Sequence, residues 1–150
     1  MGHCGRMAGT GAAALVEALA GCAGPAVTDA GYRDKAGDTV QTVQSAVASA
    51  QLAGGLELAG RSGFSVTDTV VSGAESDASS AQDTLASRQP PDAASRRLYD
   101  GIQQALQDGV DGLRDLRIAV RDGDRGGMRD ALKELGTAAG ELSKAEKVTG

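Results

Sequence analysis

Residues 98–120, LYDGIQQALQDGVDGLRDLRIAV, place apolar or small residues three or four positions apart along one stripe. This is the spacing of one face of an α-helix. Asp92 can cap the helix, because Pro90-Pro91 prevents an earlier helix from continuing into it. We therefore expect a helix from about Ala93 to Arg121. Its buried stripe should consist of Leu98, Ile102, Ala105, Leu106, Gly109, Val110, Leu113, Leu116 and Val120.

A second strong stripe follows in the C-terminal segment. Gly123 is suited to end one helix, and Asp124 can cap the next one. The apolar and small residues that follow again have helical spacing, which predicts an antiparallel partner for the preceding helix. They are Met128, Leu132, Leu135, Ala139, Leu142 and Ala145.

The first helical stripe lies closer to the N-terminus. Thr28 or Asp29 can cap a helix that runs to about Ala59, where Gly60 and Gly63 end it. The stripe steps by three and four residues through Ala36, Val40, Val43, Val47, Ala50 and Gly54.

The segment between these helices carries the weakest stripe. Ser65 and Asp68 resemble a capping box, and a helix can follow to about Arg88. Large apolar side chains are few in it, because Ser and Asp are dense. Its expected stripe is Val66, Val70, Ala74, Ala78, Ala81 and Leu85.

Four stripes joined by short turns predict an all-α protein, an antiparallel up-down-up-down four-helix bundle over residues 29–150. The chain has 27 Ala and 22 Gly but only 27 residues of Leu, Ile, Val and Phe together, so we expect a thin core with closely approaching helices. Tyr32, Tyr99 and Phe64 should fill the ends of the core.

Residues 1–21 have the organisation of a signal segment that precedes the bundle. Arg6 gives a weak positive start, and Met7 to Ala20 is a moderately apolar run. The run is too short to span a bilayer. It ends on Leu19-Ala20-Gly21-Cys22.

These four residues resemble the lipobox of bacterial lipoproteins, a Leu and two small residues before a Cys. The resemblance implies a diacylglyceryl group on the Cys22 sulfur, cleavage before Cys22, and a linker over residues 22–28. The whole chain resembles small, Ala-rich, four-helix lipoproteins of high-GC bacteria. Alternatives are a signal segment without lipidation, and a cytoplasmic protein in which the start of the chain is an ordinary helix.

The residue inventory argues against catalysis. The only His is His3 and the two Cys are Cys4 and Cys22, so the expected bundle lacks imidazole and thiol. A Ser-His or Cys-His nucleophile and a His-ligated metal site are then excluded. We expect no catalytic, cofactor-binding or metal-binding residues. The net charge of -5 argues against a nucleic-acid partner.

Five arginines recur at helical spacing across the last turn. They could form a cationic ridge for an anionic wall polymer or an acidic partner, or a solvated face neutralised by interleaved acids, which is the simpler interpretation. The arginines are Arg114, Arg117, Arg121, Arg125 and Arg129, and the acids are Asp111, Asp115, Asp122, Asp124 and Asp130.

The same turn resembles a calcium-binding EF-hand loop that starts at Asp122. Gly127 then occupies the required turn position, but Lys133 stands where a bidentate Glu belongs. We therefore interpret the turn as helix punctuation by Gly123 and Asp124.

These observations predict a membrane-anchored extracytoplasmic lipoprotein of the cell envelope, a structural or protein-interaction module without catalytic activity. Cys22 would hold it on the membrane, and an envelope protein or an anionic wall polymer would be its partner. One alternative is a ligand-binding or sensory bundle with a small molecule between Ala- and Gly-lined helices. The other is a cytoplasmic helical protein without a lipid anchor.

Overall fold

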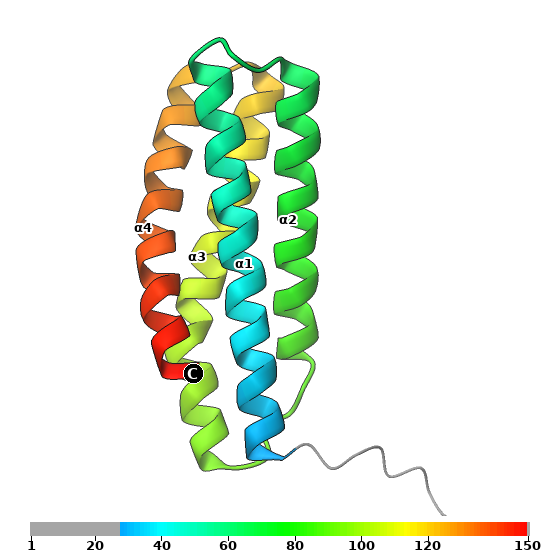
Figure 1. Cartoon of the computed structure of the whole chain (residues 1–150), viewed down its shortest axis with the longest axis vertical. Coiled ribbons are helices and arrows are strands. Elements are labelled where there is room, and N and C mark those ends of the chain that lie inside the picture. Colours follow the sequence, from blue (N-terminus) through cyan, green and yellow to red (C-terminus); the bar gives the residue numbers. More distant parts are fainter. Residues whose placement is uncertain (1–27, 150) are drawn as a thin grey trace, which may run out of the picture.

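The computed structural model describes residues 28–149, which form four helices and no strand. The helices are α1 (Asp29–Leu58), α2 (Phe64–Ala86), α3 (Ala93–Asp122) and α4 (Arg125–Thr149). Figure 1 shows that successive helices run in opposite directions along a common long axis. The predicted all-α four-helix bundle is therefore confirmed.

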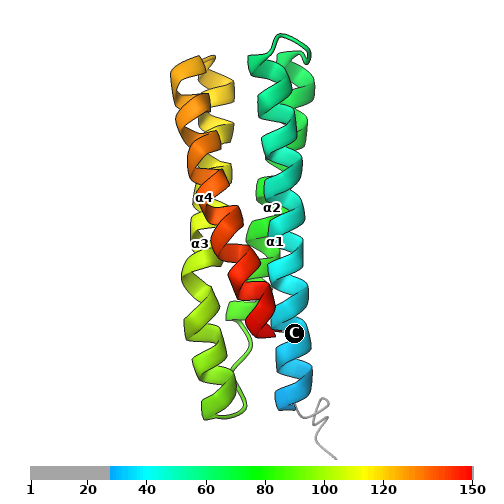
Figure 2. The same cartoon turned by 60° about the vertical axis from the view of Figure 1, so that its left-hand side comes forward.

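Each helix packs beside its neighbours in sequence, and α1 also packs against α4 and α3. The helices α2 and α4 do not contact each other and lie at opposite corners of the bundle (Figure 2). Within the described part of the chain, no helix combines the length and the apolar character needed to cross a membrane.

Three of the predicted helix boundaries have the expected physical cause. The Thr28 side chain accepts a hydrogen bond from the Gly31 N–H, and Asp92 accepts one of 2.7 Å from the Ser95 N–H. Gly123 ends α3 in the left-handed conformation, with φ of 65°, which favours a residue without a Cβ. The sequence therefore sets the start of α1 and both ends of α3.

The predicted capping box of α2 is wrong. Gly63 is the N-cap residue and makes no side-chain cap, while Ser65 lies inside the first turn. The backbone carbonyl of Ser65 accepts a hydrogen bond of 2.7 Å from the Thr69 hydroxyl. Because α2 starts before the Ser, the Ser hydroxyl is not placed to cap it.

The predicted core stripe of α1 is buried, and that of α3 is buried except for Leu98, which is only partly buried. The stripe of α2 is shifted at its start. Val66 is 61 % exposed and Val70 half-buried, whereas Thr67 and Val71 point into the core. Thr67 can be buried because its hydroxyl lies 3.0 Å from a carboxylate oxygen of Glu57.

The aromatic residues differ in their burial. Tyr32 is fully buried and Tyr99 is partly buried against the core, as expected for plugs at a bundle end. Phe64 is 51 % exposed, so its predicted role as a core plug is wrong. It is the first residue of α2, where the helix has only begun to pack against α1.

Two glycines of α3 leave room for side chains of the neighbouring helices. A Cβ placed on Gly109 would lie 2.8 Å from Cγ1 of Val43 in α1. A Cβ on Gly112 would lie 2.8 Å from Cδ2 of Leu135 in α4. Such distances are shorter than carbon atoms tolerate, so glycine is required for α3 to approach both neighbours. The expectation of close approach at small residues is confirmed at these two positions.

We predict that Gly109→Ala lowers the free energy of unfolding by about 1–2 kcal/mol, because the β-branched Val43 has little freedom to move away. The matched control is Gly140→Ala, where a Cβ meets no other atom within 4 Å. That substitution should raise the stability by ~0.5–1 kcal/mol through helix propensity. Urea unfolding followed by circular dichroism measures both. Equal effects of the two substitutions would contradict the close packing.

Candidate functional site

The predicted lipid-attachment residue Cys22 and the signal segment 1–21 lie outside the described residues. The structure describes where the chain that follows them enters the bundle. The start of α1 lies beside the connection between α2 and α3, and the C-terminal end of α4 lies toward the same end (Figure 1). We call this the near end. The far end holds the turns after α1 and α3.

A hydrogen-bonded group fixes α1 to α3 at the near end. The Ser95 hydroxyl donates a 2.7 Å hydrogen bond to the Asp29 carboxylate, and Ser95 is buried. The Ser95 N–H bonds to Asp92. This backbone hydrogen bond lowers the pKa of Asp92 below its ordinary value. The first residue of α1 is thereby held against the first turn of α3.

The arginine series of α3 is engaged mainly by acids of α2. Arg121 pairs with Asp68 at 2.8 Å, and Arg117 pairs with Glu75. Arg114 lies 3.8 Å from Glu75 and also pairs with Asp111 at 2.6 Å. Only the Arg114–Asp111 pair is of the kind that the sequence predicts. The arginines on α3 therefore act as a ladder between two helices.

Glu75 is the centre of this ladder. Its side chain is 17 % exposed and that of Arg117 is 24 % exposed, so water screens the pair only in part. The hydrogen bond to Glu75 raises the pKa of the Arg117 guanidinium above its ordinary value. Glu75 lies seven residues after Asp68, and Arg114 lies seven residues before Arg121. This matched spacing is the signal in the sequence that could have predicted the ladder.

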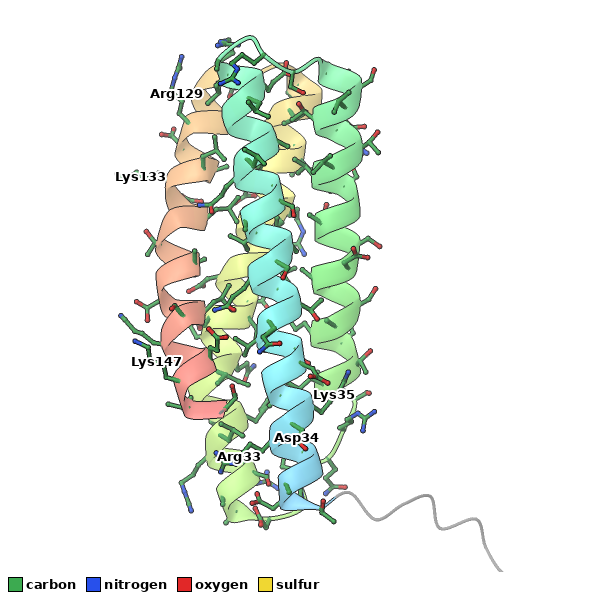
Figure 3. The ribbon with its side chains drawn as sticks, viewed as in Figure 1. Arg33, Asp34, Lys35, Arg129, Lys133 and Lys147 are labelled. Carbon is green, nitrogen blue, oxygen red and sulfur yellow. The ribbon has the colours of Figure 1, made fainter. Side chains whose placement is uncertain are left out.

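The other two arginines of the series lie at the far end and on α4. Arg125 donates a 2.6 Å hydrogen bond to the carbonyl of Leu58, one of the last carbonyls of α1. Arg129 bonds to the carbonyl of Arg125. Figure 3 shows Arg129, Lys133 and Lys147 projecting outward from α4. A continuous cationic ridge is therefore not formed, because its members serve different contacts.

The turn between α3 and α4 is helix punctuation, as expected. Asp124 accepts a 2.9 Å hydrogen bond from the Gly126 N–H, which caps α4. In residues 28–149 no group of three or more His, Cys, Asp or Glu side chains is arranged to hold a metal ion. The carboxylates around this turn therefore do not converge on one point.

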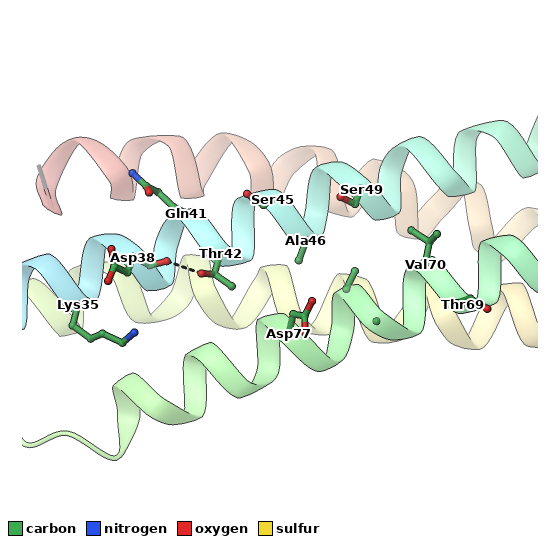
Figure 4. Close-up of a pocket in the computed structure, with 12 residues that line it drawn as sticks. Lys35, Asp38, Gln41, Thr42, Ser45, Ala46, Ser49, Thr69, Val70 and Asp77 are labelled. Atoms are coloured by element: carbon green, nitrogen blue, oxygen red, sulfur yellow. Dashed lines mark hydrogen bonds between the residues drawn. The ribbon is translucent and has the colours of Figure 1, made fainter.

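An open groove with a volume of about 790 Å³ lies between α1 and α2 (Figure 4). Its walls carry mainly hydroxyls and small side chains. Asp38, Asp77 and Lys35 contribute charges, and the Thr42 hydroxyl bonds to the carbonyl of Asp38 at 2.8 Å. The remaining lining residues are Gln41, Ser45, Ala46, Ser49, Thr69, Val70, Gly73 and Ala74.

The groove is polar, and its lining residues include no His and no Cys. Ser143 and Lys144 are adjacent in α4 and point in different directions. Lys144 pairs with Glu141 at 2.7 Å.

The Tyr32 hydroxyl is buried without a hydrogen-bond partner among the described residues. Burial raises the pKa of Tyr32 above its ordinary 10.0, and the neighbouring Tyr99 and Asp100 add to the shift. An unpaired buried hydroxyl lowers the stability of the folded state. The ring of Tyr32 therefore contributes apolar burial to the core, while its hydroxyl is destabilising.

Comparison of the chain with models of protein families, with curated proteins and with solved structures finds no match in any of the three.

We predict that Glu75→Gln lowers the free energy of unfolding by about 1 kcal/mol, because Arg117 loses its charged partner at a partly buried site. The loss should shrink in concentrated salt. Asp77→Asn on the same helix is the control, because Asp77 makes no ion pair among the described residues. Thermal unfolding at two salt concentrations provides the measurement. Equal losses in both variants would contradict a specific ladder.

We predict that Tyr32→Phe stabilises the bundle by about 1 kcal/mol, because it removes the unpaired hydroxyl without changing the ring. The folded state holds the Tyr32 proton more tightly than the unfolded state does. Wild-type protein should therefore lose stability as the pH rises above about 10, and the variant should lose less. Tyr99→Phe is the control. A less stable Tyr32→Phe variant would show that the hydroxyl has a partner.

Proposed function

We propose that this protein is a membrane-anchored extracytoplasmic lipoprotein, a structural or protein-interaction module of a bacterial cell envelope without catalytic activity. The observation that carries the proposal is Leu19-Ala20-Gly21-Cys22 at the end of an apolar run. Acylation of Cys22 would give the chain two acyl chains, and two chains make membrane anchoring stable where one does not.

The architecture is compatible with such an anchor. Only six residues separate Cys22 from the start of α1 at Asp29, and such a linker spans at most roughly 25 Å when extended. The near end of the bundle would then face the membrane. The far end, with Arg61 and the turn at Gly123, would face away from it.

The packed core favours an interaction role over binding of a small molecule inside the bundle. Gly109 and Gly112 of α3 lie against side chains of α1 and α4, and the groove between α1 and α2 is open to the surface. A ligand-binding or sensory bundle needs a largely enclosed pocket with converging polar groups. The alternative therefore has no specific observation in its favour.

We propose an envelope protein as the partner in preference to an anionic wall polymer. Arg117 and Arg121 are already paired with Glu75 and Asp68. Recognition of a polyanion by these arginines would have to break those pairs, while the carboxylates of α2 would repel the polymer.

We predict that Cys22→Ser moves the protein from the membrane fraction to the soluble fraction when it is expressed in a high-GC bacterial host. The substitution replaces the thiol with a hydroxyl and so removes the sulfur to which the diacylglyceryl group would be attached. Cys4→Ser is the matched control and should stay membrane-bound. Fractionation followed by immunoblotting makes the measurement. If wild type is soluble and full-length, the cytoplasmic alternative holds. If wild type is secreted without the membrane, the signal segment acts without lipidation.

A further inference from the structure

Among the four helices, α2 contributes the fewest large apolar side chains to the core. Only Val71 and Leu85 of this kind are buried in it. Between these two residues, over about 20 Å of helix, the buried residues are Ala74 and Ala78. The neighbouring α3 buries large apolar side chains along most of its length, namely Ile102, Leu106, Val110, Leu113, Leu116 and Val120. Burial therefore holds α2 less firmly than it holds α3.

The close helix contacts at glycine join the other three helices and leave α2 out. Gly109 and Gly112 of α3 lie against side chains of α1 and α4. A Cβ on Gly54 of α1 would lie 3.2 Å from Cδ2 of Leu132 in α4. A Cβ on Gly73, the glycine of α2, would meet nothing within 4 Å among the described residues. Gly73 instead lines the open groove between α1 and α2. The helices α1, α3 and α4 therefore interlock without α2.

The sequence of α2 gives its helix little support of its own. Eleven of its 23 residues are Ser, Thr or Asp, which favour a helix less than Ala or Leu does. The N-cap residue Gly63 makes no side-chain cap, and the first turn contains no acidic residue. The last turn contains Asp83 and no basic residue, so its charge opposes the helix dipole. The helical conformation of α2 therefore depends on contacts with its neighbours.

Partly exposed ion pairs hold α2 against α3. Glu75 pairs with Arg117, and Asp68 pairs with Arg121 at 2.8 Å. Arg121 also donates a 3.2 Å hydrogen bond to the Ser72 hydroxyl. The four charged side chains are between 17 % and 49 % exposed, so water and salt weaken each pair. Breaking these pairs costs less than uncovering a large apolar core.

The connections allow α2 to open without moving α1 or α3. The two ends of α2 are tied to opposite ends of the bundle (Figure 1), so it cannot leave as an intact helix. Residues 59–92 join α1 to α3. At about 3.3 Å per residue this segment, when unfolded, reaches much farther than the roughly 45 Å length of the 30-residue α3. Local unfolding of α2 therefore leaves the packing of α1 against α3 unstrained.

We propose that α2 is a strap, a helix that unfolds as a unit while α1, α3 and α4 stay packed, and that its ion pairs with α3 determine how often it opens. A segment with few apolar contacts and partly exposed pairs is the kind that opens below the global free energy of unfolding. Opening uncovers the sides of α1 and α3 that α2 covers. The inference goes beyond the proposed anchor and does not depend on it, because it concerns the described residues alone.

Hydrogen exchange followed by mass spectrometry tests this inference on the full chain, with Cys4 and Cys22 replaced by Ser to prevent acylation and disulfides. Amides from Val71 to Ala81 in α2 should have protection factors at least ~10-fold lower than amides from Leu106 to Leu116 in α3. Equal protection of the two segments overturns the inference, because α2 would then unfold only with the whole bundle.

Two substitutions separate the opening of α2 from global unfolding. Glu75→Gln should lower the protection of α2 about 5-fold, while the matched control Asp77→Asn leaves it unchanged. Gly109→Ala strains a contact between α1 and α3 that persists when the strap is open. It should lower the protection of α3 about 5- to 30-fold and leave that of α2 unchanged. Circular dichroism shows that each variant is folded.

A Gly109→Ala variant that loses protection equally in α2 and α3 would overturn the inference. Equal effects of Glu75→Gln and Asp77→Asn would overturn the role of the ion pairs. The wild-type comparison decides the existence of the strap even when a variant fails to fold. None of these results bears on the lipid anchor, which membrane fractionation of Cys22→Ser tests separately.

Discussion

The bundle depends on how closely α3 approaches α1 and α4. Large apolar residues are few, so burial must come from helices that approach until small side chains and backbone touch. Gly109 and Gly112 make this approach possible, and Val43 and Leu135 occupy the space that a Cβ would take. Dispersion contacts at short distance thereby replace part of the burial that Leu, Ile and Phe give to other cores.

The proposed interaction role would lie on the outside of the bundle, because helices pack closely in its interior. Charged side chains of α2 pair with charged side chains of α3 through Glu75 and its arginines. These pairs hold α2 beside α3, at the corner of the bundle that α4 does not contact. The side formed by α1 and α2 is left without such pairs.

The sequence predicts the fold well where local chemistry decides it. Asp92 and Gly123 act at helix ends through their own side chain or backbone, and the stripe of α3 is strong enough to fix its buried face. Prediction fails where tertiary contacts decide. Val66 was predicted to be buried but is exposed, and Thr67 is buried instead, because Glu57 of α1 accepts a hydrogen bond from the Thr67 hydroxyl. Glu75 was missed because its partners lie on another helix.

The central claim about function concerns the covalent state of Cys22, and the intact mass of the protein purified from membranes of a high-GC bacterial host tests it most directly. The account predicts a chain that begins at Cys22 and carries a diacylglyceryl group on its sulfur. An unmodified chain that retains residues 1–21 would contradict it.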